Sequence, residues 1–253
     1  MELFDSHAHY EDAMFDHDRH KRLEALRSSE VKYVLNCCSD VSVFDKVIEI
    51  IEAHDFVYAS IGIHPHWVME TPDNYLELIK TYITHDKVVA IGEIGLDYFW
   101  KEPKDVQERV FRAQLDLAKE LNMPVIIHDR DAHEDCLRIL EDYQPTGVLH
   151  RYGGPVDLLK KAFSWGMYVS FNNDLTYPAW QKPHIDCLME TPWENLLIET
   201  DCPYAPPYER ESERCESSDV RDVVSVIAKL RHVEEEFVAR VSMENAKTLY
   251  RIP

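Results

Sequence analysis

Short apolar runs and longer amphipathic stretches alternate along this chain of 253 residues. The short runs are apolar at most positions, which is typical of parallel strands buried on both faces. They cover residues 2–6, 33–37, 57–63, 88–92, 124–128, 147–150, 167–171 and 196–201. The longer stretches predict helices, most clearly over 104–122, where apolar residues recur at every third or fourth position. Two further helical patterns, over 218–230 and 233–249, finish the chain.

Imidazole and carboxylate side chains lie at or directly after the ends of these strands. Six of the thirteen histidines have this placement: His7, His9, His64, His66, His128 and His150. Glu93 and Asp201 follow two further apolar runs in the same way. Because borderline divalent cations prefer imidazole and carboxylate ligands, the pattern predicts a metal site assembled from several strand ends.

Eight strands alternating with helices in about 250 residues predict an α/β fold, a (β/α)8 TIM barrel formed by residues 1–253 as a single domain. The main alternative is an open, doubly wound sheet. In an open sheet the first and last strands would hold their histidine and carboxylate side chains far apart. In a barrel all strand ends meet at one mouth, so the histidine pattern favours the barrel. We expect the irregular stretch 202–217 to shape that mouth.

Composition narrows the class of protein. With 27 basic and 47 acidic residues the net charge is −20, which disfavours a long, non-specific nucleic-acid contact but not an enzyme with a locally positive pocket. The six cysteines form no C-x-x-C pair, and we expect free, buried thiols in a reducing compartment. No apolar run reaches the roughly 18 to 20 residues that span a bilayer, and no leader is evident. We expect a cytoplasmic protein without a membrane anchor.

The expected metal ligands are His7, His9, Glu93, His128, His150 and Asp201. His7 and His9 lie two apart and point the same way along a strand, where Asp5 is expected to orient one of the rings. A buried Glu93 needs a cation or strong donors, although a salt bridge to Arg130 is an alternative. His128 or His150 alone would be an ordinary core histidine. Together, four histidines and two carboxylates suit two divalent ions, with Glu93 as the bridge and Asp201 as general base.

Four further residues are candidates for substrate binding: His64, His66, Arg130 and Arg151. Either arginine suits a phosphate clamp, with surface salt bridges to Asp129 or Asp131 as the alternative. His64 and His66 are expected to contact substrate or transfer protons, unless they only face solvent in a rigid loop. The aromatic residues Tyr98, Phe99, Trp100 and Tyr204 either stack on a base at the mouth or cap the barrel. The other seven histidines, at positions 17, 20, 54, 85, 133, 184 and 232, are expected at the surface.

The ordered motifs resemble the TatD family of metal-dependent hydrolases, over essentially the whole chain. They are Asp5-Ser6-His7-Ala8-His9, Gly62-Ile63-His64-Pro65-His66, Gly92-Glu93-Ile94-Gly95-Leu96-Asp97-Tyr98, Pro124-Val125-Ile126-Ile127-His128, His150 and Glu199-Thr200-Asp201-Cys202-Pro203-Tyr204, with Glu244-Asn245-Ala246 at the end. The resemblance implies a barrel and places the family's metal ligands at the six positions given above. Two segments depart from it: His150-Arg151-Tyr152-Gly153-Gly154 replaces the family's usual His-Cys-Phe-Ser-Gly, and 215–219 replaces an Asn-Glu-Pro segment.

The function expected from these features is a deoxyribonuclease, a 3′-5′ exonuclease that cleaves phosphodiester bonds with a metal-activated water. Its expected cofactors are two divalent ions, Mg²⁺, Mn²⁺ or Zn²⁺, and its expected partner is a DNA end, with no obligate protein partner. A narrow mouth with few basic residues suits a strand end better than a long duplex. The alternatives are a two-metal amidase or esterase acting on a small substrate, and a partner-binding subunit with structural metals.

Overall fold

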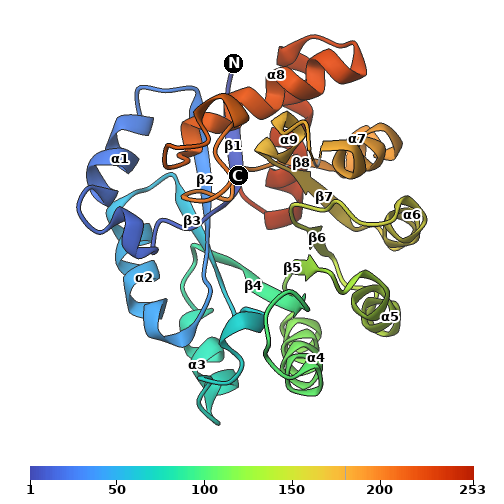
Figure 1. The fold of residues 1–253 in the computed structure, drawn as a ribbon. Coiled ribbons are helices and arrows are strands. Elements are labelled where there is room, and N and C mark those ends of the chain that lie inside the picture. Colours follow the sequence, from blue (N-terminus) through green and yellow to red (C-terminus); the bar gives the residue numbers. More distant parts are fainter. Residues whose placement is uncertain (180) are drawn as a thin grey trace.

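The structure is a computed structural model that describes residues 1–179 and 181–253. One eight-stranded sheet runs in chain order from β1 to β8, and each strand pairs in parallel with the next. Figure 1 looks into the ring that these strands form. The strands are β1 (Leu3–Ala8), β2 (Val31–Cys37), β3 (Val57–Ile61), β4 (Val88–Asp97), β5 (Val125–Arg130), β6 (Gly147–Leu149), β7 (Tyr168–Phe171) and β8 (Leu196–Ile198).

Backbone contacts between β1 and the segment after β8 bring the two ends of the sheet together. The Asp201 amide donates to the His7 carbonyl at 2.9 Å, and the His9 amide donates to the Cys202 carbonyl at 2.7 Å. Ala8 and Cys202 form a parallel bridge between them. The sheet is therefore a nearly closed barrel. This confirms the (β/α)8 prediction, and the open doubly wound alternative is wrong.

The amphipathic stretches form helices around the barrel (Figure 1). They are α1 (Arg19–Leu26), α2 (Phe44–Ala53), α3 (Tyr75–Tyr82), α4 (Lys104–Leu121), α5 (His133–Tyr143), α6 (Val156–Ser164), α7 (Gln181–Glu190), α8 (Val220–Arg231) and α9 (Glu235–Tyr250). Helix α4 ends as predicted, because Asn122 takes a left-handed conformation with φ 51°. No helix in the described part of the chain is long and apolar enough to cross a membrane.

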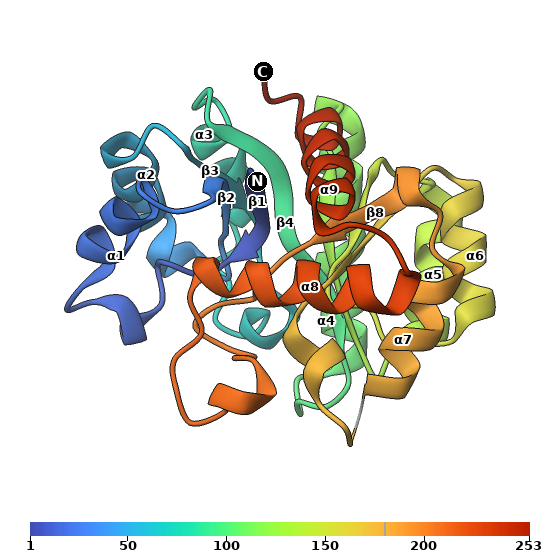
Figure 2. The ribbon, with the colours of Figure 1, turned by 90° about the horizontal axis from the view of Figure 1, so that it is seen from above.

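Helix α9 covers the end of the barrel opposite the carboxyl ends of the strands (Figure 2). Its buried Leu249 and Tyr250 pack with inward-facing residues of the strands, among them Phe4 of β1 and Ile126 of β5. In Figure 2 the loop after β8 leaves at the other end. The barrel interior is therefore a packed apolar core at one end, which leaves only the carboxyl ends of the strands for polar chemistry.

The contribution of Tyr250 to packing at this end of the barrel can be tested by substitution. Its side chain is 2% exposed, and its hydroxyl has no hydrogen-bond partner among the described residues. We expect Tyr250→Ala to lower the free energy of unfolding by about 3 to 5 kcal/mol, because it leaves a cavity, and Tyr250→Phe to lower it by less than about 1 kcal/mol. Chemical denaturation of both variants measures the difference. Equal losses in the two variants would mean that the hydroxyl, and not the packed ring, stabilises this end.

Several strand ends differ from their predicted positions. The strand predicted over 88–92 continues to Asp97, and the one predicted over 196–201 ends at Ile198. Glu93 therefore lies inside β4, whereas Asp201 lies beyond β8 in a left-handed conformation with φ 61°. The continuation of β4 depends on Gly95, because a Cβ at that position would lie 1.9 Å from the His128 carbonyl oxygen on β5. The remaining strand ends are within about two residues of the prediction.

Candidate metal centre

Six side chains meet at the carboxyl ends of the strands. They come from β1 (His7), β4 (Glu93), β5 (His128), and the residues that follow β1 (His9), β6 (His150) and β8 (Asp201). All are buried except His128, which is partly exposed. The structure thus brings together every residue that the sequence predicted as a metal ligand.

Glu93 lies between two pairs of histidines. Its Oε1 is 2.8 Å from His128 Nδ1 and 2.6 Å from His150 Nε2. Its Oε2 is 3.4 Å from His7 Nε2 and 3.6 Å from His9 Nε2. Each carboxylate oxygen therefore faces one histidine pair, which is the geometry of a bridge. The alternative expectation of a salt bridge from Glu93 to Arg130 is wrong.

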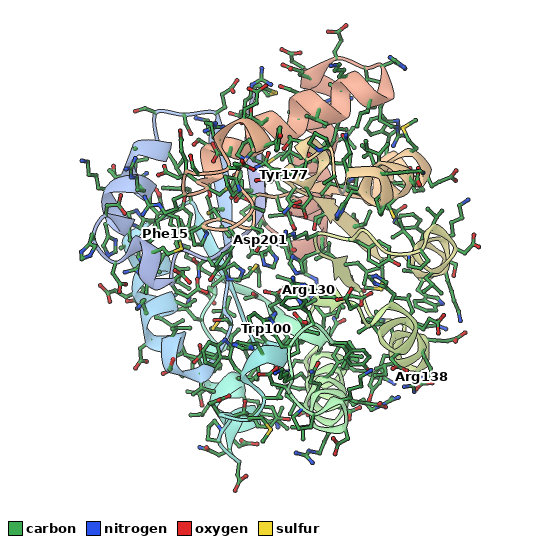
Figure 3. All side chains as sticks on the ribbon, in the orientation of Figure 1. Phe15, Trp100, Arg130, Arg138, Tyr177 and Asp201 are labelled. Atoms are coloured by element: carbon green, nitrogen blue, oxygen red, sulfur yellow. The ribbon has the colours of Figure 1, made fainter. Side chains whose placement is uncertain are left out.

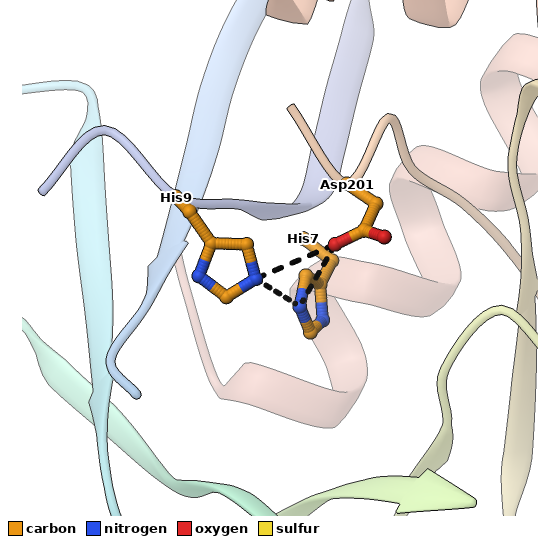
Figure 4. Close-up of side chains that lie close together, drawn as sticks. All are labelled: His7, His9 and Asp201. Carbon is orange, nitrogen blue, oxygen red and sulfur yellow. Dashed lines mark hydrogen bonds and ion pairs between the residues drawn. The ribbon is translucent and has the colours of Figure 1, made fainter. Parts of the chain in front are cut away.

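Asp201 joins the pair formed by His7 and His9 (Figure 4). Its Oδ1 is 3.4 Å from His9 Nε2 and 3.8 Å from His7 Nε2, and the two imidazole nitrogens are 3.1 Å apart. In the other pair, His128 Nδ1 and His150 Nε2 are also 3.1 Å apart. Imidazole nitrogens and carboxylate oxygens that converge in a buried space are the donors that a divalent cation takes. The residues present fit such a cation.

The carboxylates and imidazoles of this cluster stabilise one another's charged forms. Burial alone would raise the pKa of Glu93, but His150 and His7 hold it well below its ordinary range. Burial likewise opposes ionisation of Asp201, and His9 and Arg151 lower its pKa. In return, Glu93 and Glu199 overcome the effect of burial on His150 and raise its pKa to about 10. Without metal, the carboxylates are ionised and His150 carries a proton at neutral pH.

Three further carboxylates contact the outer nitrogens of these imidazole rings. Glu11 Oε1 lies 3.1 Å from His9 Nδ1, Asp97 Oδ2 lies 2.8 Å from His128 Nε2, and Glu199 Oε1 lies 3.3 Å from His150 Nδ1. Such contacts fix the orientation of a ligating ring and increase its basicity. The sequence interpretation did not assign these roles. The available signal was that Asp97 and Glu199 lie within motifs quoted for the family.

Asp5 was expected to orient a histidine ring, and this expectation is wrong. Its carboxylate accepts hydrogen bonds from the Thr200 amide at 2.8 Å and the Thr200 hydroxyl at 2.7 Å. Burial raises the pKa of Asp5 to about 7. Asp5 therefore anchors the backbone directly before Asp201 instead of contacting an imidazole.

His64 lies closer to the cluster than expected for a substrate contact alone. Its ring centroid is 4.3 Å from that of His128, and its Nε2 is 3.9 Å from Glu93 Oε1. Burial lowers the pKa of His64 to about 3, so its ring is neutral, and its Nδ1 accepts a hydrogen bond from the His66 amide at 3.0 Å. Together with Glu93 and His128 it forms a group that could hold a metal ion. His66 lies further out, 3.3 Å from Glu102 and 4.6 Å from the Trp100 ring.

The two candidate arginines have different surroundings. Arg151 Nη1 donates to Asp201 Oδ2 at 2.8 Å, and its Nε donates to Asp174 Oδ2 at 2.6 Å. Its partners are therefore not Asp129 or Asp131, which the sequence offered as alternatives. Arg130 is exposed, and its guanidinium lies 3.9 Å above the Phe99 ring.

Among the histidines expected at the surface, His54 is an exception. It is 4% exposed, and its Nε2 lies 3.0 Å from His20 Nδ1. Burial lowers the pKa of His54. This pair packs on the outside of the barrel and is separate from the candidate metal centre.

Residues 4–251 match the family model described as TatD related DNase. The chain belongs to the TatD family. The metal-dependent hydrolase YabD of Bacillus subtilis (strain 168), described as uncharacterized, is 39% identical over 254 residues, which make up 99% of each chain. The 3′-5′ ssDNA/RNA exonuclease TatD of Citrobacter koseri is 30% identical over 263 residues, 99% of each chain. Membership in this family makes the chain a metal-dependent hydrolase and confirms the resemblance stated from its motifs.

The fold comparison agrees with the sequence comparisons. The crystal structure of YjjV, a TatD homolog from Escherichia coli K12, superposes with a TM-score of 0.93 at 28% identity and covers 99% of this chain and 98% of its own. These findings favour an enzyme over the partner-binding subunit that the sequence left open.

Proposed function

We propose that the protein is a two-metal phosphodiesterase that removes nucleotides from the 3′ end of DNA. The observation that carries this proposal is the position of Glu93, with one oxygen facing each histidine pair. Support also comes from the relative named as a 3′-5′ ssDNA/RNA exonuclease. An amidase or esterase remains the second candidate, because the same metals activate water toward a carbonyl, but no contact in the structure favours it.

In this proposal His7, His9 and Asp201 would hold one ion, His128 and His150 would hold the other, and Glu93 would contribute to both sites. The ions, when bound, supply Lewis acidity for the scissile phosphate, and Mg²⁺, Mn²⁺ and Zn²⁺ are the candidates. Asp201 accepts the proton of the attacking water as general base. Two divalent ions against two ligand carboxylates leave a local charge near +2, which attracts a phosphate in spite of the net charge of −20.

Substrate contacts are proposed for His64, His66 and Arg130 at the mouth. Arg130 has no ion-pair partner in the described part of the chain, so its guanidinium is available to a phosphate. For Arg151 we propose a positioning role beside the expected phosphate contact, because Asp174 and Asp201 already engage its Nε and Nη1.

The two roles of Arg151 are separable. We expect Arg151→Lys to lower kcat by roughly tenfold and to change KM little, because a single ammonium nitrogen cannot reproduce the separate Nε and Nη1 contacts to Asp174 and Asp201, so the general base loses its fixed orientation. Steady-state kinetics on a DNA substrate measures both constants. A rise in KM at unchanged kcat would instead identify Arg151 as the phosphate clamp.

Metal binding should release protons. The pKa of His150 is raised to about 10 in the metal-free cluster, so the ring is protonated below that pH, whereas a metal ligand must be neutral. Apparent affinity should therefore rise with pH from 6 to 9, by about tenfold per unit for each proton displaced. Calorimetric titration in two buffers with different ionisation enthalpies counts the protons. Heats independent of the buffer would show that metal binding displaces no proton from His150.

The test of the proposed function is hydrolysis of a 5′-labelled single-stranded DNA by metal-free protein resupplied with Mg²⁺, Mn²⁺ or Zn²⁺. Stepwise shortening from the 3′ end that requires metal is the expected result. A strand labelled at its 3′ end should release its label in the first step. DNA left intact with every metal would overturn the nuclease proposal, and amide and ester substrates would then be tested.

We also propose the cytoplasmic location expected from the sequence. All six cysteines are free and buried, as in proteins of reducing compartments.

A further inference from the structure

Exposed aromatic rings lie beside the metal centre on the loops that follow β3 and β4. Trp67, Phe99 and Trp100 are 37%, 56% and 44% exposed, and together they form what we call the aromatic rim. Large apolar side chains that stay in water next to a site commonly mark a binding surface. In Figure 3, Trp100 and Arg130 lie on the same side of Asp201.

Ring contacts connect the rim to the metal centre. His66 lies between two rim residues, with centroids 4.9 Å from Trp67 and 4.6 Å from Trp100, and Phe99 is 5.4 Å from Trp100. Two residues before His66, His64 contacts His128 of the metal centre at 4.3 Å. The rim therefore continues the site outward, and a chain end held in the metal centre would pass over it.

Two basic residues lie next to these rings, one in space and one in the sequence. The Arg130 guanidinium lies 3.9 Å above Phe99, two residues after His128 on the chain. Lys101 directly follows Trp100 and is exposed, and neither cation has an ion-pair partner in the described part of the chain. Rings next to unpaired cations are the combination that binds the bases and phosphates of a single strand.

We propose that the aromatic rim is a stacking platform for the unpaired bases next to the cleaved end, and that it makes the enzyme selective for single strands. This inference rests on the proposed function. With a net charge of −20, general electrostatic attraction along a nucleic-acid backbone is disfavoured, so base stacking near the mouth would add to the attraction of the metal centre for the end phosphate. Stacking requires bases that are free of a partner strand. A duplex end offers such bases only after unpairing, which costs free energy.

The experiment compares the wild-type chain with the double variant Phe99→Ala, Trp100→Ala. Both side chains are largely exposed, so the barrel should fold as before, and circular dichroism checks this. Met189→Ala is the matched control, because it removes an exposed apolar side chain from α7, across the barrel from β4. Binding is measured by fluorescence anisotropy with metal present, and phosphorothioate linkages at the 3′ end of each probe slow cleavage. The probes are a single strand, the same strand with abasic 3′-terminal nucleotides, and a blunt duplex, each as DNA and as RNA.

The double variant should bind the single strand about tenfold or more weakly, whereas the control should bind as the wild type does. The wild type should prefer the single strand over both the abasic strand and the duplex, and the double variant should lose this preference. With metal, KM for the single strand should rise in the same proportion and kcat should change less than twofold. A wild type that binds the abasic strand equally well, or a double variant with wild-type affinity, overturns the proposal.

The two proposals fail in different ways. If the binding differences appear but no metal supports hydrolysis, the rim is a stacking platform and the exonuclease proposal falls. If DNA is shortened but the double variant keeps wild-type binding and KM, the exonuclease proposal stands and the rim proposal falls. The DNA and RNA arms show which sugar the platform accepts.

Discussion

Asp201→Asn is expected to lower hydrolysis of single-stranded DNA by about 10²- to 10⁴-fold, the contribution of a positioned general base. An amide keeps the size of the side chain but accepts no proton from water. Asn is also the suitable replacement for the backbone, because Asp201 has φ 61° and asparagine tolerates this left-handed conformation better than alanine does. The amide of residue 201 should still donate to the His7 carbonyl, so the barrel should remain closed.

The measurement is single-turnover cleavage at saturating metal, with metal content determined for the same sample. Asp157→Asn is the matched control, because Asp157 is exposed at the start of α6, outside the candidate centre, and should keep full activity. Folding is checked by thermal unfolding of all three proteins. If the Asp201 variant binds its metals and cleaves at the wild-type rate, Asp201 is not the general base.

The convergence of the six candidate ligands could be predicted from the sequence because it depends on a simple repeat. A histidine or carboxylate at the carboxyl end of a parallel strand points to the mouth of the barrel whatever the details of packing. His128 shows this, since its position after an apolar run was enough to place it beside Glu93. The same holds for Asp201, although its strand ends three residues earlier than predicted.

The residues that orient these ligands could not be predicted in the same way. Whether Glu11, Asp97 or Asp5 reaches an imidazole depends on the stagger of neighbouring strands and on loop conformation. Asp5 lies on the same strand as His7, yet the closure of the barrel brings Thr200 within reach of its carboxylate first. The pairing of Arg151 with Asp174 has the same origin, because the two residues are 23 positions apart and meet only once β6 and β7 are placed.

Glu93→Gln tests whether this carboxylate connects the two histidine pairs. It replaces a carboxylate that faces each histidine pair with one of its oxygens, so each of the proposed ions would lose a charged ligand. We expect turnover to fall by about 10³-fold or more and the bound metal to fall from two ions per chain to one or none. Glu134→Gln, an exposed position at the start of α5, is the matched control and should behave as the wild type does.

The effect of Glu93→Gln on the pKa of His150 can also be measured in the absence of metal. The charge of Glu93 does most to raise the pKa of His150, which reaches about 10 against the opposing effect of burial. In metal-free Glu93→Gln that charge is absent, so His150 should lose its proton at a lower pH, while the Glu134 control should leave its titration unchanged. Titration of the imidazole signals by NMR measures this shift. A variant that keeps two ions and an unchanged His150 titration would show that Glu93 neither bridges the metals nor holds the histidines together, because both effects follow from the same two oxygens.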